Sequence, residues 1–107
     1  MSSNKILPLL AMTLFVSSTA FATESCDRQP NSAYHQSMLI VDSLRAEKPG
    51  QARVFAYDGT EFTGGQSQWL HGQMRVIDRA CARGDQATAA RVLADVQQLV
   101  HAHQKRS

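Results

Sequence analysis

The stretch "CARGDQATAA", residues 81 to 90, decides how the second half of the chain folds. Gly84 stands where a helix commonly ends, because glycine adopts the left-handed conformation of that position without a Cβ clash. Asp85 suits the N-cap of a following helix, since its carboxylate can accept from the backbone N–H of Ala87 or Thr88. We therefore expect a helix on each side of the turn, lying antiparallel because the connection is so short.

The same stretch contains Arg83-Gly84-Asp85, which is also the tripeptide of integrin-binding adhesion signals. Arg79 and Arg83 would occupy the last turn of the preceding helix, where cations interact favourably with the helix dipole. The tripeptide is therefore interpreted as a helix stop, a hinge and a helix start, with adhesion as the alternative.

The segments on either side of the turn have the apolar periodicity of amphipathic helices. Residues 66–83 are expected to form the earlier helix, because Thr63 and Gln66 match the capping-box pattern. Residues 86–104 are expected to form the later one. Gly72 lies in the middle of the earlier helix and is expected to mark a close approach by another element. The two apolar stripes are Leu70, Met74, Ile77 and Cys81, and Ala89, Leu93, Val96, Leu99 and Val100.

A further helix is predicted upstream, over residues 32–47. Asn31 or Ser32 can cap its start, and the Pro49-Gly50 pair is a stop signal beyond its end. Its apolar positions are Tyr34, Met38, Val41 and Leu44. The predicted fold class is thus all-α, a small three-helix domain built on an antiparallel helical hairpin.

The segment "RVFAYDGTEFTGG", residues 53 to 65, interrupts the helical pattern. Apolar and aromatic residues flank Asp58-Gly59, a dipeptide typical of the type I′ turn in β-hairpins. A short β-hairpin over residues 53–62 is therefore predicted, with an ordered loop as the alternative.

The first 22 residues have the features of a secretory signal peptide. Lys5 provides the positive charge, Ile6 to Val16 the apolar core, and Ala20-Phe21-Ala22 a cleavage site before Thr23. The core is shorter than the roughly 20 residues that span a bilayer. We expect cleavage, export to the periplasm and a single helical domain over residues 23–107, soluble after cleavage; a retained anchor is the alternative.

Two cysteines, Cys26 and Cys81, lie in the expected mature chain. In an oxidising compartment an even pair predicts one disulfide. Closing so long a loop stabilises a fold by about 4 kcal/mol in the chain-entropy description. A redox-active or metal-binding thiol pair is the alternative.

The charge balance gives no indication of a nucleic-acid or membrane-surface partner. The chain has 11 Lys and Arg and 9 Asp and Glu, and loss of Lys5 leaves the mature segment with ten against nine, a net charge of +1. No Gly-x-Ser-x-Gly, phosphate-loop or His-Glu-x-x-His motif occurs. We expect a non-enzymatic protein without a cofactor.

Four of the seven aromatic residues gather in one connection between predicted helices: Phe55, Tyr57, Phe62 and Trp69. Such connections are normally short and polar. Tyr and Trp are typical interface anchors, so these residues are the candidate surface for a protein partner in the cell envelope. The alternative is that they cover the open end of the helical layer.

Histidines near the C-terminus, together with Met38, raise a second class of function. Export, Met38 and the tail "LVHAHQKRS" resemble the cytochrome b562 family, four-helix bundles that hold haem between a Met on the first helix and a His on the last. The resemblance implies Met38 with His101 or His103 as ligands of a periplasmic haem protein, although only three helices are expected. His71 can approach His101 across the helical hairpin, which suggests a metal site, whereas His101 and His103 lie about 200° apart on their helix.

Cys26 and the segment "RACARGDQA", residues 79 to 87, are similar to small periplasmic acid-stress chaperones of the HdeA type. That resemblance implies a compact helical domain with one disulfide that exposes apolar surface to unfolded clients at low pH. Histidines and carboxylates would supply the change of charge. A chaperone-like or stress-related interaction protein is therefore the preferred functional hypothesis, and a haem- or metal-binding protein is the alternative.

Overall fold

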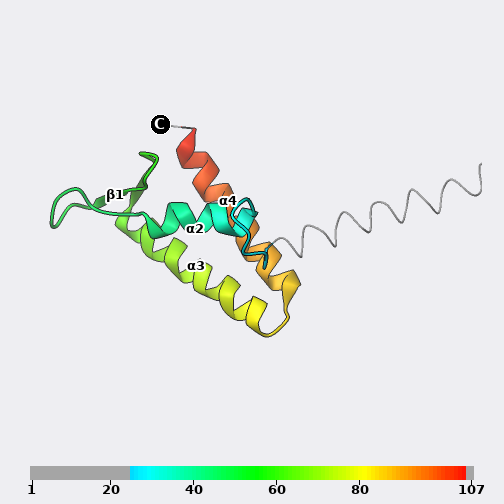
Figure 1. Ribbon diagram of the computed structural model, residues 1–107. Coiled ribbons are helices and arrows are strands. Elements are labelled where there is room, and N and C mark those ends of the chain that lie inside the picture. The colour runs from blue at the N-terminus through cyan, green and yellow to red at the C-terminus, as the bar shows by residue number, and fades with distance from the viewer. Residues whose placement is uncertain (1–24, 106–107) are drawn as a thin grey trace, which may run out of the picture.

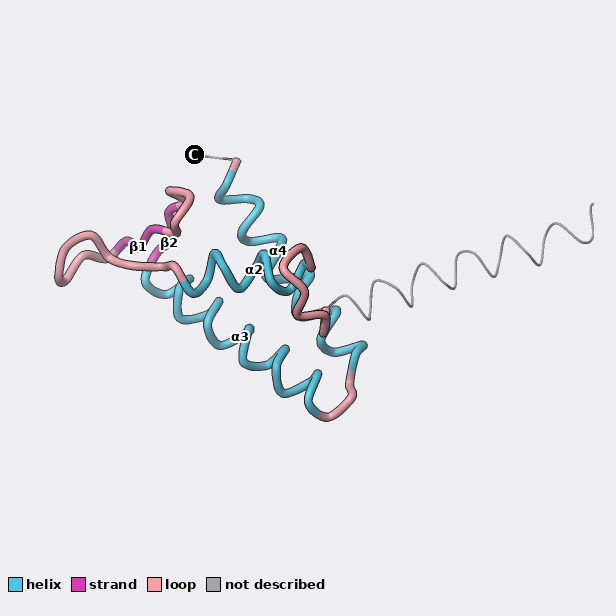
Figure 2. The backbone as a smooth tube through the Cα atoms, in the orientation of Figure 1, coloured by secondary structure: helices cyan, strands magenta, loops and turns pink. Residues whose placement is uncertain are grey.

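The computed structural model describes residues 25–105 as three helices and a two-stranded antiparallel sheet (Figures 1 and 2). The expected signal peptide lies outside the described residues. The mostly helical character predicted from the sequence is confirmed. In chain order the elements are α2 (Ala33–Asp42), β1 (Arg53–Phe55), β2 (Glu61–Thr63), α3 (Gly64–Ala82) and α4 (Gln86–Gln104).

The turn between α3 and α4 forms as the sequence predicts. Gly84 has a φ of 78°, and its N–H donates to the Cys81 carbonyl at 3.1 Å. The Asp85 N–H donates to the Ala80 carbonyl at 2.8 Å, which completes a Schellman motif. The Asp85 carboxylate then accepts from the Thr88 N–H at 3.1 Å and caps α4. The Arg-Gly-Asp tripeptide is thus a helix stop and a helix start.

The core lies where α3 and α4 face each other and where α2 lies across both (Figure 1). Burial of apolar side chains between the three helices is the main source of stability in such a fold. The central side chains, which are at most 2 % exposed, are Val41, Phe62, Leu70, Ile77, Ala80, Ala89, Leu93 and Val96.

The prediction for the first helix was wrong at its end: α2 stops at Asp42 rather than at residue 47. The Ser43 hydroxyl donates to the Ile40 carbonyl at 2.8 Å. Arg45 then pairs with Phe55 through two backbone hydrogen bonds of 2.8 and 3.0 Å. Pairing with the hairpin therefore outweighs the helix propensity of residues 45–48.

The predicted β-hairpin is present, but its turn is not type I′. Val54 pairs with Phe62, and both side chains turn towards the core. A type I′ turn needs positive φ at both central residues, whereas only Gly59, with a φ of 88°, has one here. The Gly59 N–H donates to the Ala56 carbonyl and the Ala56 N–H to the Thr60 carbonyl. The connection is a three-residue loop with glycine at its left-handed position.

Helix α3 begins at Gly64, two residues before the predicted start. The Thr63 hydroxyl accepts from the Gln66 N–H at 3.1 Å, and the Gln66 side-chain oxygen accepts from the Thr63 N–H at 2.9 Å. These bonds form the predicted capping box. Gly72, by contrast, has no atom within 4 Å of where a Cβ would stand, so the close approach expected there was wrong.

Within residues 25–105, no helix has both the length and the apolar character needed to cross a membrane.

Candidate functional site

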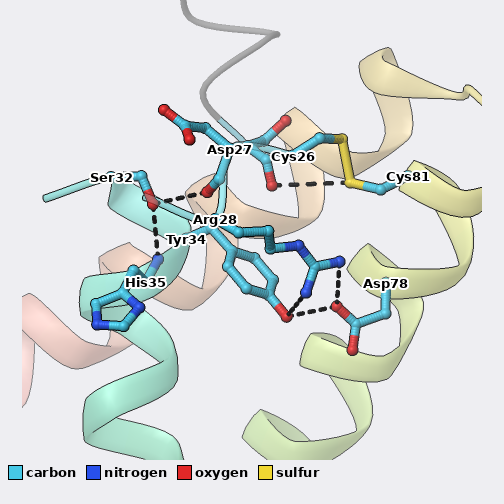
Figure 3. Close-up of polar contacts among 9 residues, drawn as sticks. Cys26, Asp27, Arg28, Ser32, Tyr34, His35, Asp78 and Cys81 are labelled. Atoms are coloured by element: carbon cyan, nitrogen blue, oxygen red, sulfur yellow. Dashed lines mark hydrogen bonds and ion pairs between the residues drawn. A yellow bond between two sulfur atoms is a disulfide. The ribbon is translucent and has the colours of Figure 1, made fainter. Parts of the chain in front are cut away.

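The predicted disulfide is present and attaches the segment before α2 to the last turn of α3 (Figure 3). Cys26 and Cys81 are separated by 55 residues in sequence and their Cα atoms lie 5.6 Å apart. The Ser25 carbonyl oxygen lies 3.8 Å from Cys81 Sγ; this is a contact only, since a disulfide sulfur has no proton to donate. The two cysteines have a structural role here.

A polar cluster beside the disulfide joins α2 to α3 (Figure 3). The Tyr34 hydroxyl donates to Asp78 Oδ1 at 2.5 Å. The Arg28 guanidinium donates to the Tyr34 hydroxyl at 2.7 Å, lies 3.2 Å from Asp78 Oδ1 and covers the tyrosine ring at 4.2 Å from its centroid. Arg28 from the segment before α2, Tyr34 from α2 and Asp78 from α3 thus form a single polar cluster.

The tyrosine of this cluster is held in its neutral form. Burial, followed by the hydrogen bond to Asp78, raises the pKa of Tyr34 to about 12. At neutral pH the phenol is therefore a hydrogen-bond donor, and it is only 3 % exposed. The cluster orders the start of the domain.

Ser32 connects the segment before α2 to the start of that helix. Its hydroxyl donates to the Asp27 carbonyl at 2.7 Å and accepts from the His35 N–H at 3.1 Å, which caps α2 (Figure 3). Among residues 25–105, no buried side-chain nitrogen or oxygen lacks a partner. The buried polar side chains that attach the segment before α2 to the helices therefore have hydrogen-bond partners.

The four aromatic residues of the predicted partner surface do not share one environment. Phe62 is 1 % exposed and belongs to the core, so its place on a surface was wrong. Phe55 is half-buried in β1. Tyr57, at the tip of the hairpin, is 65 % exposed, and Trp69, on α3, is 40 % exposed. Of the four predicted residues, Tyr57 and Trp69 are therefore the exposed ones.

A cavity of about 310 Å³ opens beside the hairpin, where the start of α3 meets the end of α4. Within its lining, the Arg53 guanidinium forms an ion pair with the Glu61 carboxylate. Two charged side chains of this wall are thus paired with each other. The lining residues are Arg53, Phe55, Gly59, Glu61, Phe62, Thr63, Gln66 and His103.

His103 connects the last turn of α4 to the hairpin. Its ring stacks on Phe62 with 4.9 Å between centroids and 27° between planes. Nδ1 lies 2.9 Å from the Glu61 carbonyl oxygen, and Nε2 lies 3.3 Å from Gln66 Nε2. Sequence reasoning considered His103 as a haem or metal ligand or as an ordinary histidine at a polar helix end, and missed this contact with the sheet.

The other candidate haem or metal ligands lie in different surroundings. Met38 is half-buried on α2 and packs against the core. His71 is half-buried on α3, and His101 is exposed on α4, on the side away from His103, as their spacing predicts. Over residues 25–105, no group of three or more His, Cys, Asp or Glu side chains could hold a metal ion.

Comparison of the chain with known protein families, with curated proteins and with solved structures finds no match in any of the three.

Proposed function

We propose that this protein is a periplasmic, non-enzymatic interaction protein of the cell envelope, which binds another protein through the tip of its hairpin. The observation that carries the proposal is Tyr57, a large aromatic side chain that is 65 % exposed. Tyrosine is enriched among the residues that dominate binding energy at protein interfaces. Export rests on the signal sequence at residues 1–22, which would be removed to leave a soluble chain.

The backbone on both sides of Tyr57 is fixed, which favours a role in binding. The Tyr57 N–H donates to the Ser43 hydroxyl at 2.9 Å, and the Thr60 N–H donates to Asp58 Oδ1 at 3.0 Å. Gln104 of α4 donates to the other oxygen of Asp58 at 3.2 Å. An aromatic residue held in place before binding loses less conformational entropy when a partner arrives.

A second exposed apolar region lies on α3. Trp69 is 40 % and Val76 is 36 % exposed, and they are seven positions apart, which is about two helical turns. Exposed apolar side chains of this kind suit a chaperone-like role with unfolded clients, which is the stress-related form of the proposal. A folded partner and an unfolded client are distinguished by experiment.

Site-specific photo-crosslinking in cells tests the proposal. A photoreactive phenylalanine analogue replaces Tyr57, and a matched protein carries it at Gln98, an exposed polar position on α4. We expect a discrete cross-linked species from position 57 and none from position 98. Equal labelling from the two positions, or none from either, would contradict binding at the hairpin tip.

Two measurements on the purified protein separate the remaining classes of function. Suppression of aggregation of an unfolded client, weakened by Trp69→Ala, would support the chaperone form. A haem absorption band, or stoichiometric metal by elemental analysis, would instead support the alternative of a periplasmic haem- or metal-binding protein and would overturn the proposal.

A further inference from the structure

Four exposed residues surround Gly72 on the surface of α3. Residues three and four positions apart are neighbours on a helix. The neighbours of Gly72 are Gln68, Trp69, Arg75 and Val76, and all four are exposed. Helices α2 and α4 both pack on the other side of α3 (Figure 1). These five residues thus form one accessible surface, the outer face of α3.

Gly72 leaves the centre of the outer face without a side chain. No atom lies within 4 Å of where its Cβ would stand, so packing within the described chain does not require a glycine there. Glycine also disfavours the helix in which it lies. What its missing side chain does permit is a close approach by another backbone from outside, as at the crossing point of two helices.

Charge is distributed unequally along the outer side of α3. Before Gly72 the helix contains no Lys, Arg, Asp or Glu, whereas Arg75 and Arg79 follow it. Both arginines are exposed, and neither belongs to an ion pair within residues 25–105. The half of the face after Gly72 is therefore cationic, and the half before it is uncharged and contains the indole ring of Trp69.

We propose that the outer face of α3 binds a second copy of this chain, with the two α3 helices crossing antiparallel at Gly72. A two-fold axis through Gly72 places each residue opposite the one equally far on its other side. Trp69 of each copy then faces Arg75 of the other, and Gln68 faces Val76. A guanidinium over an indole is a favourable cation–π pair, and the symmetry makes two of them. The face is thus complementary to itself.

The distribution of charge selects the antiparallel orientation. In that orientation the cationic half of each helix lies against the uncharged half of the other. A parallel pair would instead set Arg75 against Arg75 of the second copy, and like charges at contact distance repel. One helix face is a small contact area, so the dimer belongs to the weak, transient class. It uses a surface separate from the hairpin tip and stands whether or not Tyr57 binds a partner.

Two measurements on the purified, oxidised protein test for the dimer. Sedimentation velocity from about 10 μM to about 1 mM, which spans weak association, should show a reversible change from monomer to dimer. Trp69 is the only tryptophan in the sequence, so its fluorescence reports on the interface directly. Its emission should shift to shorter wavelength over the same range of concentration. A protein that stays monomeric throughout would overturn the proposal.

Substitutions separate the cation–π pair from a general effect of charge. Arg75→Gln should weaken association roughly five- to thirtyfold, because it removes both symmetry-related pairs. The matched variant Arg91→Gln removes the same charge from an exposed position on α4 and should leave association intact. Gly72→Gln should abolish association while the monomer stays folded, since its side chain enters open space. Equal effects of the two arginine substitutions, or a dimer that tolerates Gly72→Gln, would contradict the proposal.

The orientation of the helices is tested without any substitution. In a mixture of isotope-labelled and unlabelled protein, isotope-filtered NMR detects contacts between copies alone. Contacts from the Trp69 ring to the Arg75 side chain of the second copy are expected. Contacts between the two Trp69 rings, or from Trp69 to α4 of the second copy, would overturn the arrangement. A monomer whose Trp69 emission shifts only on addition of an unfolded client or of anionic lipid vesicles would assign the face to that partner instead.

Discussion

Tyr34 donates a 2.5 Å hydrogen bond to Asp78, a residue 44 positions further along the chain. The bond joins α2 to the C-terminal part of α3 and lies beside the Cys26–Cys81 disulfide (Figure 3). Arg28 contacts both partners, so a single polar cluster holds three segments together. The start of the described chain is thus attached by a covalent bond and by a charge-assisted hydrogen bond.

Tyr34→Phe should destabilise the protein by about 1 to 2 kcal/mol, because Asp78 loses a buried donor while the ring remains. Urea unfolding followed by circular dichroism measures the change. Tyr57→Phe is the matched control, since that side chain is exposed at the hairpin tip, and it should leave stability unchanged. Equal effects of the two substitutions would show that the Tyr34 hydroxyl contributes nothing.

The same tyrosine predicts a loss of stability at alkaline pH. The pKa of Tyr34 is about 12 in the folded protein and 10 in the unfolded chain. Between these values the unfolded chain releases its proton first, so the free energy of unfolding falls as pH rises from 10 to 12. The stabilisation is complete below pH 10. Unfolding midpoints at pH 9 and pH 11 should differ more for the unmodified protein than for Tyr34→Phe.

Removing the disulfide should cost about 4 kcal/mol in the chain-entropy description, because the two cysteines are 55 positions apart in the sequence. The double variant Cys26→Ser with Cys81→Ser avoids a free thiol and should match the reduced unmodified protein in thermal unfolding. An unchanged melting temperature would show that the bond does not stabilise the fold.

Two glycines should respond in opposite directions to the same substitution. Gly72→Ala should stabilise the protein by up to about 1 kcal/mol, because a methyl group there meets open space and alanine favours helix. Gly84→Ala should destabilise it by about 1 to 2 kcal/mol, because residue 84 has a φ of 78°. Thermal unfolding of the pair tests this, and a shift of the same sign in both would contradict it.

Sequence reasoning worked where the determining signal is local. The Gly84 turn, the Asp85 cap and the capping box at Thr63 each depend on residues within one helical turn, and each is present as predicted. The end of α2 was wrong because the pairing of Arg45 with Phe55 is tertiary. The type of hairpin turn was wrong because Asp58-Gly59 fits more than one loop length.

The contact between His103 and the start of α3 had a usable signal that was not followed. Counting outwards from Gly84 in an antiparallel hairpin of helices places residue 103 opposite about residue 65. That is next to Gln66, which His103 contacts. The stacking on Phe62 had no such signal, because it depends on how the sheet packs against the helices.

The position of the disulfide has a consequence for the order in which the chain matures. A chain that emerges from its N-terminus presents Cys26 first, and this thiol must wait for Cys81 while α2, both strands and nearly all of α3 follow. Ring closure therefore comes late and cannot guide the first steps of collapse. Of the described helices, α4 alone lies after Cys81, so it is the one helix that can still be missing when the bond first becomes possible.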